Sequence, residues 1–158
     1  MLRVDIRDLQ RGPVRTDGHL DPDDHVFEGL GLGLAGPVAV SGQLQATGAG
    51  EYLWRGHVHS VVRGECRRCL SEVLDEVDID VNAAVFSTDP DAADDPDFYP
   101  LSERANSVDV TEVVREELAL AAQTDLLLCR EDCAGLCPKC GADLNAGPCA
   151  CHTPAEPV

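Results

Sequence analysis

The sequence predicts an α+β fold: an antiparallel β-sheet, arranged as a meander or barrel-like, covered by one main helix and followed by a small cysteine-rich module. Three observations predict it. Apolar and polar residues alternate in several successive runs, one later segment repeats its apolar residues at helical spacing, and eight cysteines fall in close pairs. The alternating runs follow one another without helical segments, which favours antiparallel strands. A chain of 158 residues has room for one such domain and a small module.

Alternation predicts two strands in the first third of the chain. Residues 2–7 alternate apolar with charged side chains, and residues 38–44 alternate again. The acidic segment 17–28 between them is rich in turn formers and predicts a connection. Residues 31–36 match the GxGxxG pattern of dinucleotide-binding folds, but a proline and a strand follow where that motif needs a helix. We therefore expect a glycine turn and no nucleotide site.

The segment 51–63 predicts a longer strand with two different faces. The apolar face consists of Tyr52, Trp54, Val58 and Val62. The polar face and the turn after it form a basic strip, defined as Arg55, His57, His59, Arg63, Arg67 and Arg68. The strip is the candidate contact surface of the chain, and a solvated polar face without function is the alternative for its two histidines.

The net charge of the chain is −17, which argues against broad nucleic-acid binding because phosphate contacts need cations. Most of this charge lies between Leu70 and Asp125, where 16 Asp and Glu stand against two Arg, a net of −14. From Tyr52 to Cys69 the sign reverses, since four Arg stand against one Glu, a net of +3. The chain is therefore predicted to be an acidic protein with one local basic contact.

The segment 77–85 has an apolar residue at every second position and predicts a third strand, with Ala83 and Val85 on its buried face. The segment 87–107 holds three prolines and six Asp or Glu without periodicity, so we expect an acidic loop without fixed structure. Asp109 then caps a predicted helix that should cover the sheet. The apolar face of this helix consists of Val110, Val113, Val114, Leu118 and Ala121.

The eight cysteines form four close pairs, which are Cys66 with Cys69, Cys129 with Cys133, Cys137 with Cys140, and Cys149 with Cys151. Close pairs let one turn of backbone deliver two thiolates to a tetrahedral zinc ion. Pro138 and Gly141 strengthen this interpretation for the third pair, because proline restricts the entry to the turn and glycine tolerates a positive φ after it. Eight buried cysteines without a metal are the alternative, which the tight pairing disfavours.

The preferred division of the cysteines predicts two zinc ions per chain. Cys137, Cys140, Cys149 and Cys151 would share one ion because they lie within 15 residues, and the other four would share the second. The second ion would join the middle of the chain to its end. The predicted organisation is an α+β domain over 1–128 with the acidic loop 87–107, a thiolate zinc module over 129–152, and a tail over 153–158.

The sequence holds no run of about 20 apolar residues and no signal-type N-terminus, so we expect a cytoplasmic location and no membrane contact. It also offers no nucleophile paired with a base at a recognisable spacing, and no open metal site. We therefore expect no enzymatic activity and no small-molecule substrate.

Two cysteine motifs resemble one known family. The run from Cys129 to Asn145, CREDCAGLCPKCGADLN, with Cys149 and Cys151 after it, is similar to the C-terminal block of YceD-type proteins. So are ECRRCL at 65–70 and VREEL at 114–118, and the resemblance covers about residues 36–151. The resemblance implies a cytoplasmic protein of bacteria or plastids that supports the accumulation or processing of large-subunit ribosomal RNA. Some members lack the C-terminal cysteine block, which implies that function lies nearer the first cysteine pair and the helix.

On this resemblance, the expected role is that of a non-catalytic ribosome-assembly factor. Its expected partner is a large-subunit ribosomal RNA precursor, met by the basic strip, or a basic ribosomal protein, held by the acidic body. Two alternatives come from other classes of protein. A redox-responsive zinc protein would release its metal on oxidation. An RNA-acting hydrolase would need an open metal site, or a base and an oxyanion stabiliser.

Overall fold

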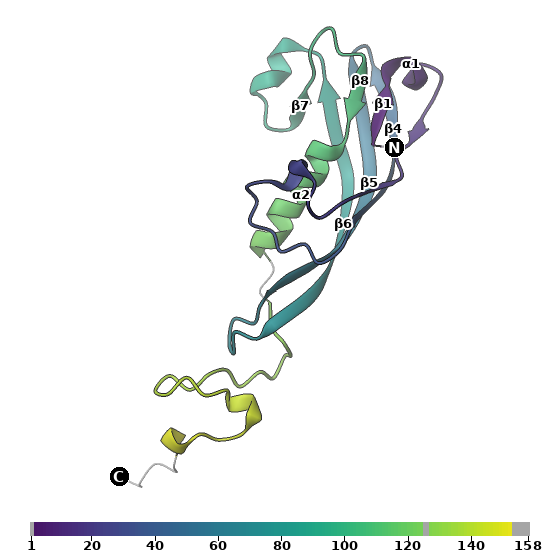
Figure 1. Cartoon of the computed structure of the whole chain (residues 1–158). Helices are drawn as coiled ribbons and strands as arrows, with labels where there is room; N and C mark the ends of the chain where they lie inside the picture. The colour runs from purple at the N-terminus through teal and green to yellow at the C-terminus, as the bar shows by residue number, and fades with distance from the viewer. Residues whose placement is uncertain (1, 125–126, 153–158) are drawn as a thin grey trace.

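The computed structural model describes residues 2–124 and 127–152, and shows an elongated molecule (Figure 1). The strands are β1 (Arg3–Asp5), β2 (Val14–Arg15), β3 (Gly18–Leu20), β4 (Val38–Gly48), β5 (Glu51–Glu65), β6 (Glu72–Ser87), β7 (Phe98–Pro100) and β8 (Ser107–Asp109). The helices are α1 (Ile6–Leu9) and α2 (Thr111–Thr124), with short 3-10 helices η1 (His25–Phe27), η2 (Pro90–Asp94), η3 (Leu144–Ala146) and η4 (Ala150–His152). The predicted tail, 153–158, lies outside the described residues.

The main sheet is open and mixed. Its strand order is β2-β4-β5-β6-β7, with β3 also pairing with β4. Every pair from β2 to β6 is antiparallel, whereas β7 runs parallel to β6. Strands β1 and β8 form a separate antiparallel pair. The long strands are thus antiparallel as predicted, but the barrel-like alternative is wrong because the sheet does not close, and β7 makes the sheet mixed.

The acidic segment 87–107 has structure where the sequence predicted none. It contains η2 and β7, and the edge strand β7 extends the sheet. The ring of Tyr99 lies 5.2 Å from that of Phe86, and the Tyr99 hydroxyl donates a hydrogen bond of 2.8 Å to Glu116 on α2. These contacts come from distant parts of the chain, so local periodicity carries no sign of them.

Strand β5 has the two faces that its alternation predicted, and its inward face centres on Trp54. The indole is fully buried and its Nε1–H donates to Thr16 Oγ1 at 2.7 Å. Gly42 and Gly56 pair across β4 and β5 directly against the ring, and a Cβ at Gly56 would overlap the indole. The glycine pair therefore makes the space that this large side chain fills.

Strand β6 departs from the predicted alternation at a β-bulge. Arg55 of β5 lies opposite two residues of β6, Asn82 and Ala83, because the ladder shifts register there. One extra residue moves every later side chain to the other face of a strand. Ala84 and Phe86 are buried as a result, and Ala83 is exposed although the sequence predicted it inside.

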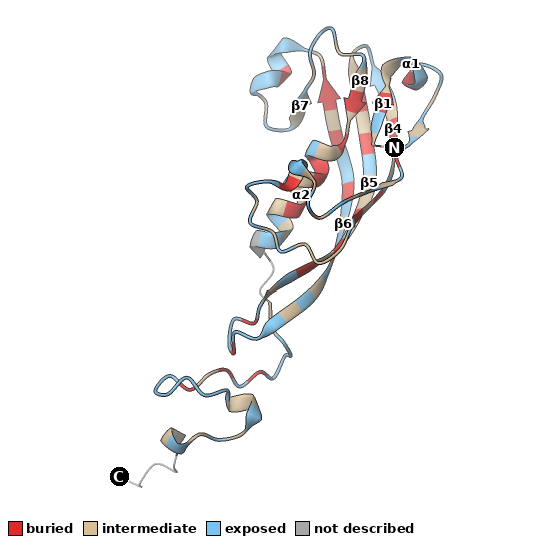
Figure 2. Cartoon of the chain, in the orientation of Figure 1, coloured by how far each residue is buried: buried red, intermediate tan, exposed pale blue. Residues whose placement is uncertain are grey.

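Helix α2 lies across one face of the sheet, and buried residues gather between the two (Figures 1 and 2). The carboxylate of Asp109 accepts a hydrogen bond of 3.0 Å from the amide of Thr111, the first residue of the helix. The carbonyl of Val110 accepts the first helical bond, so Asp109 lies one position before the N-cap. The helix contacts β6 and η1, so it does not cover the sheet alone. Arg115 fixes the N-terminal segment against it by donating to the carbonyls of Val26 and Glu28. No helix in the described ranges has the length and apolar content to cross a membrane.

Strands β5 and β6 continue beyond the core as an arm that ends in a turn at residues 66–71, and residues 127–152 lie beside that turn (Figure 1). The buried residues form two separate clusters. The larger fills the space between sheet and helix, and the smaller surrounds Cys66, Cys69 and Cys133 at the tip of the arm. The cysteine-rich end is thus packed independently of the core.

Candidate metal centres and the polar sheet face

The structure brings the cysteines together in the two groups of four that the sequence analysis preferred. Site 1 is defined as Cys66, Cys69, Cys129 and Cys133, and site 2 as Cys137, Cys140, Cys149 and Cys151. Within each group the sulfur atoms lie within 4.8 Å of one another, and each group could hold a metal ion. Site 1 draws its ligands from the β5–β6 turn and from a segment about 60 residues later, whereas site 2 is local.

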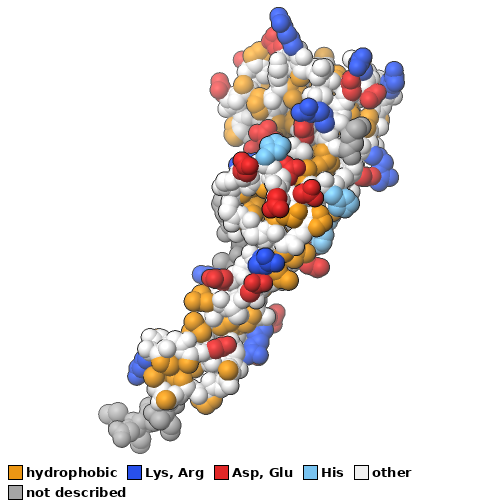
Figure 3. Space-filling model, viewed as in Figure 1, with side chains coloured by type: hydrophobic (Ala, Val, Ile, Leu, Met, Phe, Trp, Pro, Cys, Tyr) orange, Lys and Arg blue, Asp and Glu red, His pale blue; other side chains and the backbone are white. Residues whose placement is uncertain are grey.

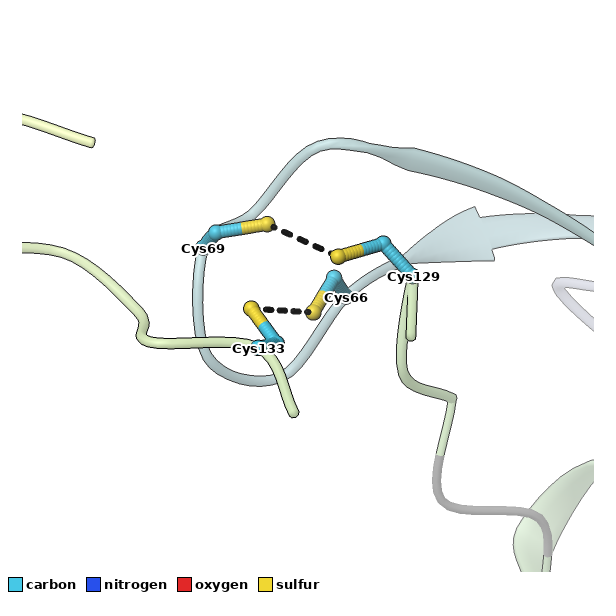
Figure 4. A group of neighbouring side chains, drawn as sticks. All are labelled: Cys66, Cys69, Cys129 and Cys133. Carbon is cyan, nitrogen blue, oxygen red and sulfur yellow. Dashed lines mark hydrogen bonds between the residues drawn. The ribbon is translucent and has the colours of Figure 1, made fainter. Parts of the chain in front are cut away.

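The four side chains of site 1 point toward one another (Figure 4). The Sγ atoms of Cys66 and Cys133 are 3.7 Å apart, and those of Cys69 and Cys129 are 3.5 Å apart. A tetrahedral ion with metal–sulfur bonds of about 2.3 Å places its sulfurs about 3.8 Å apart. The sulfurs therefore already have nearly the spacing that one tetrahedral ion requires.

Each site begins with the same turn. In site 1 the amide of Leu70 donates to the Cys66 carbonyl at 2.9 Å, and in site 2 the amide of Gly141 donates to the Cys137 carbonyl at 2.8 Å. The residue after the second cysteine has a positive φ in both turns, +63° at Leu70 and +75° at Gly141. The two Cys-x-x-Cys turns thus share one backbone conformation, which directs both thiols of a pair to one side.

The surroundings of the thiols favour thiolates at the first cysteine of each turn. Hydrogen bonds from the backbone, led by the amide of Cys129, lower the pKa of Cys66 to about 6. Backbone hydrogen bonds led by the amide of Cys140 lower the pKa of Cys137 to about 6. Desolvation and hydrogen bonds to neighbouring sulfurs raise the pKa of Cys129 to about 12. A divalent cation would relieve this crowding of negative charge and let the remaining thiols ionise.

Asn145 connects the two sites, and the sequence analysis did not identify it. It lies in η3, between the second and third cysteines of site 2, and its Nδ2 donates to Cys133 Sγ of site 1 at 3.2 Å. Its Oδ1 accepts from the amide of Ala134 at 2.8 Å and from Arg130 at 2.7 Å. Hydrogen bonds to ligands orient them and tune metal affinity. Its position beside the cysteine run is the only local signal, because the bond depends on the folded loop.

The histidines of the basic strip are paired with carboxylates across the sheet. His57 makes contacts of 2.8 Å with Asp80 and 3.0 Å with Asp78, and His59 makes one of 2.9 Å with Asp78. The hydrogen bond that the His57 ring donates to Asp80 raises the pKa of His57. A histidine that contacts two carboxylates adds no net positive charge to this face, even when it is protonated.

The arginines of the basic strip differ in the contacts that they make. Arg63 forms an ion pair of 3.2 Å with Glu72. Arg68 donates to the carbonyl of Cys133 at 3.1 Å, which ties the turn of site 1 to the later segment, and Arg67 is exposed. Figure 3 shows the side of α2, where Lys and Arg side chains are also scattered among Asp and Glu. The strip is therefore not one continuous cationic surface, and Arg55 is its member on the sheet for which no ion pair is found in the described chain.

Residues 54–157 match the model of the family described as large ribosomal RNA subunit accumulation protein YceD. The chain belongs to the YceD family. The match begins at Trp54 in β5 and includes β6, α2 and both cysteine groups.

The chain is also similar to uncharacterized proteins of Mycobacterium bovis and of the Mycobacterium tuberculosis strains CDC 1551 and H37Rv. Each is 34% identical over 105 residues, which is 65% of this chain and 49% of the relative. The chain therefore spans about half the length of the curated relatives it matches. No solved structure matches it significantly.

Proposed function

We propose that this protein is a cytoplasmic, zinc-dependent and non-catalytic ribosome-assembly factor that supports the accumulation or processing of large-subunit ribosomal RNA. The observation that carries the proposal is the family match over residues 54–157, whose description names large-subunit ribosomal RNA. The partner is a large-subunit precursor, contacted through its RNA or through a basic ribosomal protein. The acidic composition, with a net charge of −17, suits a protein that holds a basic partner or touches RNA at one local surface.

The chemistry of the two sites supports zinc as the metal. All donors are sulfurs, which suits zinc and excludes oxygen-preferring ions such as magnesium and calcium. Each set supplies four ligands, so a bound zinc ion would have no open position for substrate or water. Such an ion would stabilise structure and would not catalyse a reaction, which supports the non-catalytic assignment.

Metal analysis tests the zinc assignment directly. Protein purified without chelator should contain about two zinc ions per chain, and the C149S variant should contain about one. A stoichiometry near zero in freshly purified protein, or iron in place of zinc, would contradict the assignment.

The assembly role is tested in cells that lack the protein. Depletion should lower the ratio of large-subunit to small-subunit ribosomal RNA, and the wild-type chain should restore it. Tagged wild-type protein should also migrate with large-subunit precursors in a sucrose gradient. A normal RNA ratio together with migration only in the protein-sized fractions would disprove the proposed role.

One observation favours the redox-responsive alternative as a second candidate. Each site has one exposed cysteine, Cys129 in site 1 and Cys140 in site 2, where an oxidant can reach the sulfur. If this is the function, dilute peroxide should release zinc reversibly and change the partner that the protein binds. Zinc release without any change in partner binding would leave oxidation as damage only.

A further inference from the structure

The sheet face opposite α2 carries a polar row that runs across the strands and not along them. Arg15 of β2 pairs with Gln43 of β4, and Gln43 pairs with Arg55 of β5. The bulge in β6 adds Asn82 opposite Arg55. We call these four residues the cross-strand row. Adjacent strands lie about 4.8 Å apart, so the two arginines stand about 10 Å apart with an amide between them.

The cross-strand row lines an open depression of about 590 Å³ on this face. Ser41, His57 and Asp80 complete its polar rim, and Gly42 and Gly56 form part of its floor. The indole of Trp54 packs against these glycines from the core side. The floor is therefore backed by a fully buried side chain of the core, and a ligand bound above it would meet a packed surface.

Positive charge concentrates at the row because its neighbours along the strands are neutralised. The next two positions on β5 are His57 and His59, which face Asp80 and Asp78. The row itself contains no carboxylate. Arg15 has one ion pair, of 3.2 Å with Asp17, and both of its partners are largely exposed. An exposed pair of this kind is worth about 1 kcal/mol or less, so a stronger anion can displace it.

The chemistry of the row fits phosphate. Each guanidinium offers a planar fork of donors that matches a phosphate, and the amides of Gln43 and Asn82 can both donate and accept. No Trp, Tyr or Phe lines the depression, so it lacks the large aromatic platforms on which unpaired bases commonly stack. The contact suited to this surface is therefore with the sugar-phosphate backbone and not with the base faces.

We propose that the cross-strand row, Arg15-Gln43-Arg55-Asn82, binds the phosphodiester backbone of RNA. The inference rests on the proposed function, because that function makes large-subunit ribosomal RNA the phosphate-bearing partner of this surface. It moves the contact predicted from sequence. The carboxylate partners of His57, His59 and Arg63 lie on the neighbouring strand β6. Arg15, which the strip did not include, is paired with the exposed Asp17 and lies in register with Arg55 through Gln43.

The test measures binding of a fluorescein-labelled single-stranded RNA of about 12 nucleotides. Fluorescence anisotropy gives the affinity at each of several salt concentrations. The double variant R15Q/R55Q should bind at least tenfold more weakly than wild type. The slope of log affinity against log salt should become shallower by about 1.4, since each phosphate contact of a single strand contributes about 0.7. The matched control is R7Q/R11Q, which removes the same charge from exposed arginines that also pair with nearby aspartates. The control should change affinity less than twofold. Zinc content and circular dichroism should be unchanged in both variants.

Four results would overturn the inference. Equal weakening by the two double variants would show that only overall charge matters. Unchanged binding by R15Q/R55Q, or no binding by wild type at low salt, would show that the row is not the contact. Displacement of the RNA by polyglutamate at equal charge concentration would show a surface for acidic peptides instead.

A gradient experiment separates this inference from the proposed function. If wild type and R15Q/R55Q bind the oligonucleotide equally and both migrate with large-subunit precursors, the row is wrong and the assembly role stands. If wild type binds the oligonucleotide through the row but does not migrate with precursors, the row stands and the assembly role fails.

Discussion

Site 1 and site 2 begin with the same Cys-x-x-Cys turn but hold together different lengths of chain. The ligands of site 1 come from two segments 60 or more residues apart, and three of its four cysteines are buried. The ligands of site 2 lie within 15 residues, and only Cys137 is buried. The comparison teaches that ligand spacing along the chain, more than ligand type, decides what a metal ion stabilises. An ion in site 1 would join the arm to residues 127–133, whereas one in site 2 would order a local loop.

The largest expected effect comes from removing one ligand of each site in turn. C66S should release the arm, because site 1 then loses a metal whose binding free energy is of order 10 kcal/mol. Amides of β5 beyond Val62 and of β6 before Val77 should exchange about a hundredfold faster. C149S should speed exchange only within 137–151. Hydrogen exchange followed by mass spectrometry measures both.

The core provides the control for this comparison. Because the core cluster is separate from the cluster at site 1, exchange at Val58 and Val81 should be similar in the two variants. If C149S loosened the arm as much as C66S, the two sites would not differ in the way described here.

The grouping of the cysteines could be predicted from the sequence because chelating pairs are a local signal, and the four pairs left few ways to divide them. The alternation of β5 was equally readable. What failed was non-local: the bulge beside Arg55, the pairing of β7 with β6, and the contacts that order the acidic segment. Each depends on which distant residue lies opposite, and a single sequence does not state that register.

The net charge of the basic strip could not be predicted from the sequence for the same reason, because it depends on residues of other strands. Its members on β5 lie on one face of the strand as predicted, but the carboxylate partners of His57, His59 and Arg63 come from β6. The addition of Arg15 depends on the pairing of a two-residue strand, which no periodicity reveals. The family could be identified because its cysteine motifs are short and contiguous.

A smaller effect is expected at the connection between the two sites. N145A removes the hydrogen bond to Cys133 Sγ, and should lower the zinc affinity of site 1 about tenfold although Asn145 belongs to the loop of site 2. Competition with a chromogenic chelator measures this affinity. N145D is the matched variant, because it keeps the acceptors for Ala134 and Arg130 but replaces the donor with a negative charge beside the sulfur. It should weaken site 1 at least as much. Equal zinc affinities of site 1 in wild type, N145A and N145D would show that the hydrogen bond from Asn145 does not couple the two sites.

The residue after the second cysteine of each turn should affect zinc affinity. Introducing glycine in site 1 should raise the affinity, and removing glycine from site 2 should lower it. Leu70 is 57% exposed at φ +63°, a conformation that costs a side-chain residue about 1–2 kcal/mol. L70G removes that strain but adds about 0.5–1 kcal/mol of chain entropy, so site 1 should bind zinc about threefold more tightly. G141A introduces the strain into site 2 and should weaken it about fivefold. Weaker binding by L70G would mean that the leucine side chain makes a contact worth more than its strain.

The smallest expected effect lies on the sheet, away from both sites. Because Asp80 raises the pKa of His57 above 6.5, the protonated form stabilises the fold fully below that value and loses this contribution as pH rises through the raised pKa. His57 is 42% exposed and Asp80 82% exposed, so solvent screens most of the effect. The denaturant midpoint of wild type relative to H57Q should therefore be slightly higher at about pH 6 than at about pH 8. A difference of opposite sign would contradict this pairing.

The chain has one tryptophan, and its indole lies directly beneath the floor of the depression on the polar sheet face. Its emission therefore reports on a single, known position with no label attached. Unfolding of the sheet should shift the emission to longer wavelength as water reaches the ring, while loss of zinc from the distant arm should leave it almost unchanged. The same optical signal can show whether a ligand bound above Gly42 and Gly56 disturbs the sheet or rests on it without strain.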